Sequence, residues 1–160
     1  MPTITSSVFL RQPIETDLPV FYEQQLDPEA TRMAAFPARE REPFMAHWRK
    51  IMGDETVRLR TILCDGRVAG NVVSFEQSGE REVGYWLGRE YWGKGIATEA
   101  LRQFLLLEAT RPLHAHVATH NIGSRRVLEK CGFRLLREDS DFSPASDVQM
   151  REYVLVPERR

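Results

Sequence analysis

A glycine-containing turn between an expected strand and an expected helix is the part of this sequence best suited to bind a ligand. The strand is Glu82–Leu87, the turn is Trp92-Gly93-Lys94-Gly95, and the helix starts at Ile96-Ala97-Thr98. The first turn of a helix exposes unpaired backbone N–H groups and the positive end of the helix dipole. Glycine lets the backbone approach an anion closely because it has no Cβ. This pattern predicts a loop that grips the pyrophosphate of a nucleotide-like cofactor.

Two common phosphate-binding motifs do not fit this turn. A dinucleotide fingerprint needs a third glycine, and after Gly93 and Gly95 that position is Thr98. A P-loop needs Gly-Lys followed by Ser or Thr, whereas Lys94 is followed by Gly95. The turn is therefore expected to serve another class of phosphate-containing ligand.

Three histidines, His114, His116 and His120, suggest a second chemistry, which is metal binding. Imidazoles two residues apart on a strand can share a metal ion. However, we expect no carboxylate or cysteine nearby to complete a ligand set, and this strand is expected to lie inside the sheet. We therefore expect no metal site, and keep only His120, beside Asn121, as an alternative catalytic base.

The elements that position the glycine turn follow from apolar periodicity and chain breakers. We expect loops after Asp27-Pro28, including the charged run at 39–42, and at 139–147. The predicted strands are 8–12, 57–64, 68–75, 82–87, 113–119, 133–138 and 148–156, and the predicted helices are 16–26, 44–52, 95–109 and 121–131.

The order of these elements predicts the fold class. Asp65-Gly66 is a strong two-residue hairpin turn, so the three strands between 57 and 87 should form an antiparallel meander. The strand–helix–strand unit that follows implies a right-handed parallel crossover. We expect an α/β (α+β) fold with a mixed, mostly antiparallel sheet of about seven strands, flanked by helices, with one parallel step at its centre.

Composition narrows the function class. The chain has 160 residues with 42% hydrophobic and 28% charged residues and a formal net charge of −1, which fits one soluble domain over residues 1–160 without a global basic field for nucleic acid. Cys64 and Cys131 lack a disulfide or metal-ligand spacing, so we expect reduced, buried thiols in a cytoplasmic protein. We expect neither a signal peptide nor a membrane partner, since the longest aliphatic run is Leu105–Leu107.

Two motifs together resemble those of the GNAT superfamily of acetyl-CoA-dependent N-acetyltransferases. The first is the strand Glu82–Leu87 with the segment Trp92–Ala100, and the second is Asn121–Phe133, one helix and one strand later. The forms Tyr-Trp-Gly-Lys-Gly and Asn-x-x-Ser followed by Leu-Glu-Lys look most like the Rim-type branch, which includes enzymes that acetylate N-terminal amines of ribosomal proteins. Two departures stand out: Glu90 replaces the usual Gln or Arg, and Leu128 replaces a tyrosine that protonates the leaving thiolate in many members.

The resemblance implies a site for acetyl-CoA as co-substrate, without a metal. The pyrophosphate would lie on the N–H groups of Gly93 to Thr98, and the pantetheine arm beside the strand that ends at Trp86-Leu87, whose backbone could also polarise the thioester carbonyl. Asn121 would contact the arm from the other side, and Arg125 or Arg126 would either reach a phosphate or lie in solvent. The implied cofactor-binding residues are Trp86, Leu87, Trp92, Gly93, Lys94, Gly95, Ile96, Ala97, Thr98, Asn121, Ser124 and Arg126.

Two residues are candidates for the proton transfers that acyl transfer to nitrogen requires. Glu82 would accept a proton from the amine, through water; the alternative is a salt-bridged glutamate at a strand end. Ser124 would protonate the departing thiolate; the alternative is a helix-start serine that bonds the backbone. Neither Cys64 nor Cys131 has a nearby histidine in the motifs, so no covalent relay is expected and transfer should be direct, in a ternary complex.

The sequence thus favours an N-acetyltransferase that acts on a primary amine, either a protein N-terminal α-amine or a small-molecule amine. The alternative is a non-catalytic acyl-CoA-binding sensor or interaction module on the same fold. The acceptor side should involve the first 80 residues, where Phe36 and Phe44 are candidates and Trp48 is expected in the core, and the loop at 139–147. Acceptor identity, acyl length and oligomeric state, a homodimer included, stay open.

Overall fold

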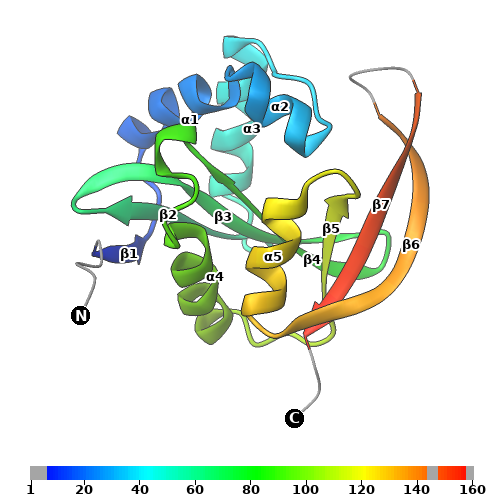
Figure 1. Cartoon of the computed structure of the whole chain (residues 1–160). Helices are drawn as coiled ribbons and strands as arrows, with labels where there is room; N and C mark the ends of the chain where they lie inside the picture. The colour runs from blue at the N-terminus through cyan, green and yellow to red at the C-terminus, as the bar shows by residue number, and fades with distance from the viewer. Residues whose placement is uncertain (1–6, 144–147, 158–160) are drawn as a thin grey trace.

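The protein is built on one seven-stranded mixed sheet, as the sequence predicted. A computed structural model describes residues 7–143 and 148–157, and the strands are arranged in the order β1-β2-β3-β4-β5-β7-β6. All neighbouring strands are antiparallel except β4 and β5, which form the expected parallel step (Figure 1). The strands are β1 (Val8–Arg11), β2 (Arg58–Cys64), β3 (Arg67–Gln77), β4 (Glu80–Leu87), β5 (Leu113–Ala118), β6 (Phe133–Ser143) and β7 (Val148–Pro157).

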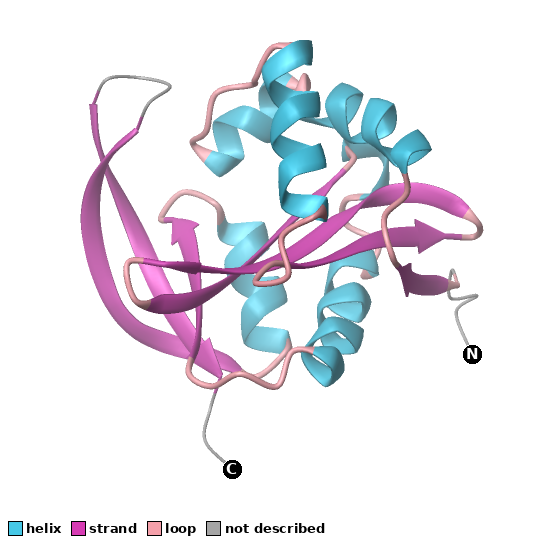
Figure 2. Ribbon diagram, turned by 180° about the vertical axis from the view of Figure 1, so that it is seen from behind, coloured by secondary structure: helices cyan, strands magenta, loops and turns pink. Residues whose placement is uncertain are grey.

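Helices cover both faces of this sheet (Figures 1 and 2). One face packs against α4 and α5 around a core that includes Phe104, Leu101 and Leu128. The other face packs against α1 and α3, where Phe21 and Trp48 lie in a second core, so the expected core position of Trp48 is confirmed. The helices are α1 (Leu18–Gln25), α2 (Pro28–Ala34), α3 (Arg41–Met52), α4 (Ile96–Leu107) and α5 (Ile122–Lys130), with short 3-10 turns at Glu15–Asp17 and Arg89–Tyr91.

Helix α2 corrects the prediction of a loop after Asp27-Pro28. Asp27 accepts a hydrogen bond from the backbone N–H of Glu29, which caps the helix, and Pro28 occupies its first turn. An aspartate followed by a proline is a helix-start signal as much as a helix-stop signal, because the missing proline N–H would be unpaired in the first turn anyway. The pair therefore ends α1 and begins α2.

The predicted loop at 139–147 was also wrong over part of its length. Strand β6 continues to Ser143 and pairs with β7 up to the register Ser143↔Val148, and residues 144–147 lie outside the described part of the chain. The two long strands form the ribbon drawn at the right of Figure 1. Polar residues at 139–141 suggested a loop, but strand pairing with β7 keeps them extended.

Strands β4 and β5 separate from each other along most of their length. Their ladder contains only the pairs Arg81↔Leu113 and Glu82↔His114, although β4 runs on to Leu87. Beyond the ladder, β5 pairs on its other side with β7 from Ala115 to Ala118. The backbone of β4 beyond Glu82 therefore has no hydrogen-bond partner on β5, although it lies in the middle of the sheet. An extended ligand can form hydrogen bonds with this edge of β4.

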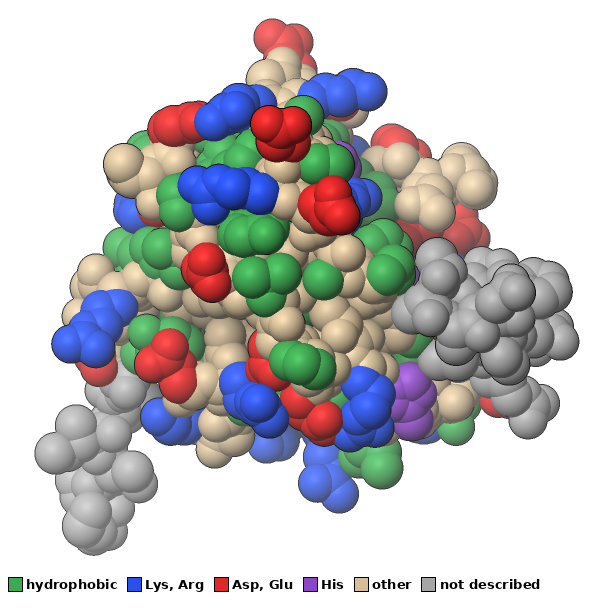
Figure 3. Space-filling view, turned by 90° about the horizontal axis from the view of Figure 1, so that it is seen from above, with side chains coloured by type: hydrophobic (Ala, Val, Ile, Leu, Met, Phe, Trp, Pro, Cys, Tyr) green, Lys and Arg blue, Asp and Glu red, His purple; other side chains and the backbone are tan. Residues whose placement is uncertain are grey.

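The surface carries charges of both signs. Figure 3, viewed from the side where α1–α3 lie in Figure 1, shows Lys and Arg side chains interspersed with Asp and Glu over that face. Among the described helices, none has both the length and the apolar character needed to cross a membrane. Both cysteines are free thiols, as predicted; Cys64 is buried and Cys131 is only half-buried.

Candidate active site

A cavity of about 490 Å³ lies where the separated ends of β4 and β5 meet the first turns of α4 and α5. Its walls come from four segments: α2, the last residues of β4, the glycine loop with the start of α4, and the start of α5. The lining residues are Ala30, Met33, Ala34, Tyr85, Trp86, Leu87, Tyr91, Trp92, Gly93, Gly95, Ile96, Ala97, Thr98, Asn121, Gly123, Ser124, Arg126, Val127 and Lys130.

The cavity reaches both faces of the sheet. Successive residues of a strand point to opposite faces, and Tyr85 and Trp86 are adjacent on β4. Tyr85 contacts the core on the α4–α5 face, whereas the indole of Trp86 donates a hydrogen bond to the carbonyl of Gln24 on α1. Because both residues line the cavity, it extends through the gap between β4 and β5. A ligand in this gap can present one group to each side of the sheet.

The glycine loop has the geometry that the sequence predicted. Gly93 and Gly95 have φ values of 72° and 80°, in the left-handed region that other residues rarely adopt. Gly95 is the residue immediately before α4, and it leaves the first N–H groups of that helix without intrahelical partners. The Trp92 indole donates a hydrogen bond of 2.9 Å to the carbonyl of Leu87, which ties the loop to the end of β4. The loop therefore offers backbone donors to an anion at the cavity wall.

The start of α5 forms the opposite wall. Asn121 caps the helix, since its Oδ1 accepts a hydrogen bond of 3.2 Å from the backbone N–H of Ser124. The Ser124 hydroxyl accepts a hydrogen bond of 3.0 Å from the hydroxyl of Tyr85. Burial raises the pKa of Tyr85 to about 12, so this phenol keeps its proton near neutral pH. With its oxygen engaged by Tyr85, Ser124 has its own hydroxyl proton available for another acceptor.

Eleven of the twelve residues expected to bind the cofactor line this cavity, and only Lys94 does not. Lys94 is exposed at the tip of the loop. Arg126 lines the cavity, whereas Arg125 pairs with Glu129 and lies 4.5 Å above the ring of Tyr153, away from the site. Of the two arginines that the sequence offered as phosphate ligands, only Arg126 lies at the cavity.

Several cavity residues were missed by sequence reasoning. Tyr85 is one position from the predicted Trp86 and carries the hydroxyl that contacts Ser124. Its place next to Trp86 on the same strand could have indicated that it lines the site. The α2 residues were missed because α2 itself was not predicted. The full set is Ala30, Met33, Ala34, Tyr85, Tyr91, Gly123, Val127 and Lys130.

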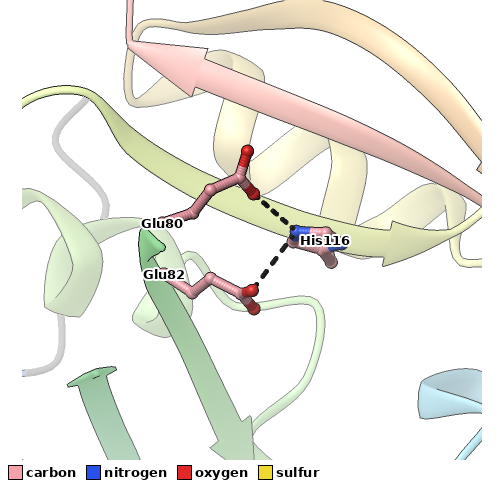
Figure 4. Close-up of side chains that lie close together, drawn as sticks. All are labelled: Glu80, Glu82 and His116. Carbon is pink, nitrogen blue, oxygen red and sulfur yellow. Dashed lines mark ion pairs between the residues drawn. The ribbon is translucent and has the colours of Figure 1, made fainter. Parts of the chain in front are cut away.

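Glu82 lies outside the cavity, on the face of β4 that also carries Trp86. Its carboxylate is 3.5 Å from His116 Nε2, so the predicted alternative of an ion-paired glutamate has a partner (Figure 4). Burial raises the pKa of Glu82 above its ordinary value, although the nearby His116 opposes this. Trp86 is four positions after Glu82, which places their Cα atoms about 13 Å apart along the strand. Proton transfer to Glu82 would therefore need water.

Gly84 lies between Trp86 and Glu82 on the same face of β4. A Cβ built on Gly84 meets no atom within 4 Å, so the surface between the cavity and the Glu82 carboxylate is open at this point. A larger side chain there would fill this space. The alternation of β4 thus provides an unobstructed route from Trp86 to Glu82.

The three histidines are distributed differently from the prediction. His120 is exposed, with Nε2 2.7 Å from the carbonyl of Arg32, while His114 and His116 face the β4 glutamates. The premise that no carboxylate lies near them was wrong, because Glu80 and Glu82 are within ion-pair distance. A hydrogen bond from His116 Nδ1 to a carboxylate oxygen of Glu152, 3.2 Å away, and the surrounding glutamates raise the pKa of His116.

Comparison with known proteins identifies the family that shares this arrangement. Residues 7–134 match the family model described as "Acetyltransferase (GNAT) domain". The chain belongs to the GNAT acetyltransferase family. This span holds β1 to β5, the five helices of the described residues and both motifs of the site. The sequence resemblance to the GNAT superfamily is thereby confirmed.

Individual relatives agree with the Rim-type resemblance. YdaF of Bacillus subtilis (strain 168), described as a candidate ribosomal N-acetyltransferase, is 33% identical over 101 residues, which are 58% of this chain and 55% of YdaF. The chain thus matches about half the length of this relative, and 39% and 30% of two others. Two solved structures share the fold: RimL, a ribosomal alpha-N-protein acetyltransferase in complex with coenzyme A (TM-score 0.78, 16% identity, 97% of each chain), and spermidine N-acetyltransferase from Vibrio cholerae in complex with CoA and spermine (TM-score 0.79, 18% identity, 93% and 94%).

Proposed function

We propose that this chain is an acetyl-CoA-dependent N-acetyltransferase, one domain over residues 1–160, that transfers acetyl directly to a primary amine in a ternary complex. The observation that carries this proposal is the cavity that passes through the gap between β4 and β5. A phosphate-binding loop forms one wall of this cavity, and the acidic face of β4 lies beyond its other end. Two ligands that enter from opposite faces would meet inside the sheet.

The residues present fit coenzyme A. Its pyrophosphate would accept hydrogen bonds from the N–H groups of the segment Gly93–Thr98, with help from Arg126 and Lys130 on the cavity wall. Its pantetheine arm would extend along the edge of β4 that β5 leaves unpaired, near Trp86 and Leu87. Acetyl-CoA supplies the acetyl group as a thioester, and residues of this chain would bind it and move the protons.

The amine must lose its proton before it attacks the thioester carbonyl. At pH 7 this costs about 4.6 kcal/mol for a lysine-like amine of pKa near 10.4, but only about 1.4 kcal/mol for an α-amine of pKa near 8. Glu82 accepts this proton through water along the open surface at Gly84. Because Glu82 is distant and acts through water, a weakly basic amine is the better substrate. A strongly basic amine would depend more on the Glu82 carboxylate.

The thiolate must gain a proton as the C–S bond breaks. Ser124 is placed on the cavity wall to donate it, and Tyr85 holds the Ser124 oxygen from behind. This pair replaces the tyrosine that many family members carry at the position of Leu128, whose side chain is buried here. From a protonated amine the nitrogen loses two protons in all: the first passes through Glu82 to solvent, and the second, lost as the amide forms, balances the proton that Ser124 gives to sulfur and regains from solvent.

Two acceptor classes fit this proposal: a protein N-terminal α-amine and a small-molecule amine. The likeness to YdaF supports the first, and the acidic residues beyond Gly84 suit a cation of either kind. We also propose that the reaction takes place in the cytoplasm, where the free thiols of Cys64 and Cys131 would stay reduced.

Thiol release from acetyl-CoA in the presence of an amine panel tests the proposal. The panel contains peptides with free N-termini, the same peptides with blocked N-termini, polyamines and aminoglycosides. We expect release with at least one free amine and none with the blocked peptides. Tight acetyl-CoA binding without release across the panel would overturn the proposal and favour a non-catalytic acyl-CoA sensor.

A further inference from the structure

A cluster of metal-ligating side chains lies outside the cavity, where β4 and β5 are still paired. Glu80 and Glu82 project from β4 toward His116 on β5, as Figure 4 shows. His116 Nε2 lies 3.5 Å from a carboxylate oxygen of Glu82 and 3.8 Å from one of Glu80. One ligand atom from each of the three residues falls within 4.8 Å of the other two. The arrangement depends on the β4–β5 ladder, which pairs residues 32 positions apart in the sequence, such as Glu82 and His114.

The tautomer of His116 follows from its other contact. Nδ1 lies 3.2 Å from a carboxylate oxygen of Glu152, and since an ionised carboxylate only accepts, Nδ1 carries the proton. In the neutral imidazole, Nε2 then holds the lone pair. Nε2 is buried and makes no hydrogen bond with any described residue, although two carboxylates face it. A histidine that ligates a metal through one nitrogen characteristically donates the other N–H to a carboxylate, as His116 does to Glu152.

The spacing fits a tetrahedral ion. Metal–ligand distances of about 2.0–2.2 Å place neighbouring ligand atoms about 3.3–3.6 Å apart in a tetrahedral site. The contact of 3.5 Å between His116 and Glu82 already falls in this range, and that of 3.8 Å to Glu80 needs only a small side-chain adjustment. Three protein ligands of the types nitrogen, oxygen and oxygen leave a fourth position for water, as in open zinc sites.

The charges around the cluster also favour a cation. Glu80, Glu82 and Glu152 all lie within 3.8 Å of His116. The guanidinium of Arg137 contacts Glu80 at 3.4 Å, but it is shared with Asp139 at 3.0 Å. His114 contacts Oε2 of Glu80 at 3.5 Å, whereas Oε1 faces His116 at 3.8 Å and accepts a hydrogen bond of 3.4 Å from Arg137. Carboxylates half-buried together repel one another unless positive charge lies between them.

We propose that Glu80, Glu82 and His116 form a binding site for a divalent transition-metal ion of the zinc type, with Glu152 holding His116 in the ligating tautomer. Imidazole and carboxylate together select zinc, cobalt or nickel over magnesium or calcium, which prefer all-oxygen sites. Glu82 is also the proton acceptor in the proposed acetyl transfer, so a bound ion and that role compete for one carboxylate. The site itself does not depend on the proposed function, because the ion is bound by side chains present with or without acetyl-CoA.

Titration of the full chain with Zn²⁺, followed by calorimetry without acetyl-CoA, tests the site. We expect one ion per chain, and an affinity that falls at least about 100-fold in His116→Ala and in Glu82→Gln and about 10-fold in Glu152→Gln. Glu76→Gln on β3 and His120→Ala in the turn before α5 are matched controls that remove the same groups elsewhere, and both should bind as the wild type does.

Co²⁺ gives a second readout. A four-coordinate site produces intense visible absorption, and this spectrum should be lost in Glu80→Gln, a nearly isosteric change whose fold is checked by circular dichroism. Absence of stoichiometric binding would overturn the proposal. Equal affinity in the wild type and His116→Ala would do so too, because the ion would then occupy an adventitious carboxylate site.

Discussion

The hydroxyl pair Tyr85–Ser124 makes a prediction whose size can be worked from the structure. If Ser124 protonates the thiolate and Tyr85 only holds its oxygen, Tyr85→Phe removes one neutral hydrogen bond of 3.0 Å. Such a bond contributes about 0.5–1.5 kcal/mol, which corresponds to a fall in kcat of roughly 2- to 12-fold. Ser124→Ala removes the proton donor itself, and general acid catalysis contributes at least about 100-fold.

The double variant separates positioning from independent action. When Ser124 is already alanine, Tyr85 has nothing to hold, so Tyr85→Phe should then change kcat by less than about 2-fold. The assay is initial-rate CoA release with the best amine of the panel, and KM for acetyl-CoA should stay near the wild-type value throughout. Tyr153→Phe removes a phenol hydroxyl on β7 while keeping the ring under Arg125, and it should leave kcat unchanged. An equal effect of Tyr85→Phe on kcat in both backgrounds would refute the claim that Tyr85 acts only through Ser124.

Three further perturbations follow from the same structure. Gly84→Val fills the open surface between Trp86 and Glu82, so KM for the amine should rise about tenfold while KM for acetyl-CoA stays unchanged. An unchanged KM for the amine would show that the amine does not use this surface. Gly95→Ala forces alanine to φ near 80° at a cost of about 1–2 kcal/mol, and should weaken acetyl-CoA binding seen by calorimetry; undiminished affinity would count against the loop. Burial alone would raise the pKa of Glu108, but hydrogen bonds, first among them one from Ser74, lower it to about 2. Because the folded pKa of Glu108 lies below its unfolded pKa, its ionised form stabilises the fold above about pH 4.5, and this stabilisation is lost as the pH falls towards 2. In urea unfolding, the wild type should therefore lose about 2 kcal/mol of stability between pH 7 and pH 3 that Glu108→Gln does not lose. Equal losses in both proteins would contradict this.

Local sequence signals predicted the centre of the fold well. The Asp65-Gly66 turn, the alternation of β4 and the paired glycines of the loop each act over a few residues, and the structure places all of them as expected. Helix α2 was missed because Asp27-Pro28 carries the same residues whether a helix ends or begins there. The span at 139–143 was taken for a loop because its extension comes from pairing with β7, which the residues themselves do not reveal.

Only the cavity residues that belong to sequence motifs were predictable. Trp86, the loop and Asn121 belong to contiguous motifs, so their convergence on one cavity followed from the order of the elements. The contacts of Glu82 did not follow from the order of the elements. They come from His116 on β5 and, through it, from Glu152 on β7, and no local pattern links these strands. The carboxylates near His116 were missed for the same reason, since they arrive across the ladder rather than along the chain.

Two-substrate kinetics with product mass analysis tests the central claim most directly. We expect acetyl to move from acetyl-CoA to the amine with one CoA released per acetyl, and double-reciprocal plots to intersect, as direct transfer in a ternary complex requires. Parallel lines with an acetylated form of the chain would contradict direct transfer. Binding of acetyl-CoA with no acetylated amine would contradict the assignment of an acetyltransferase altogether.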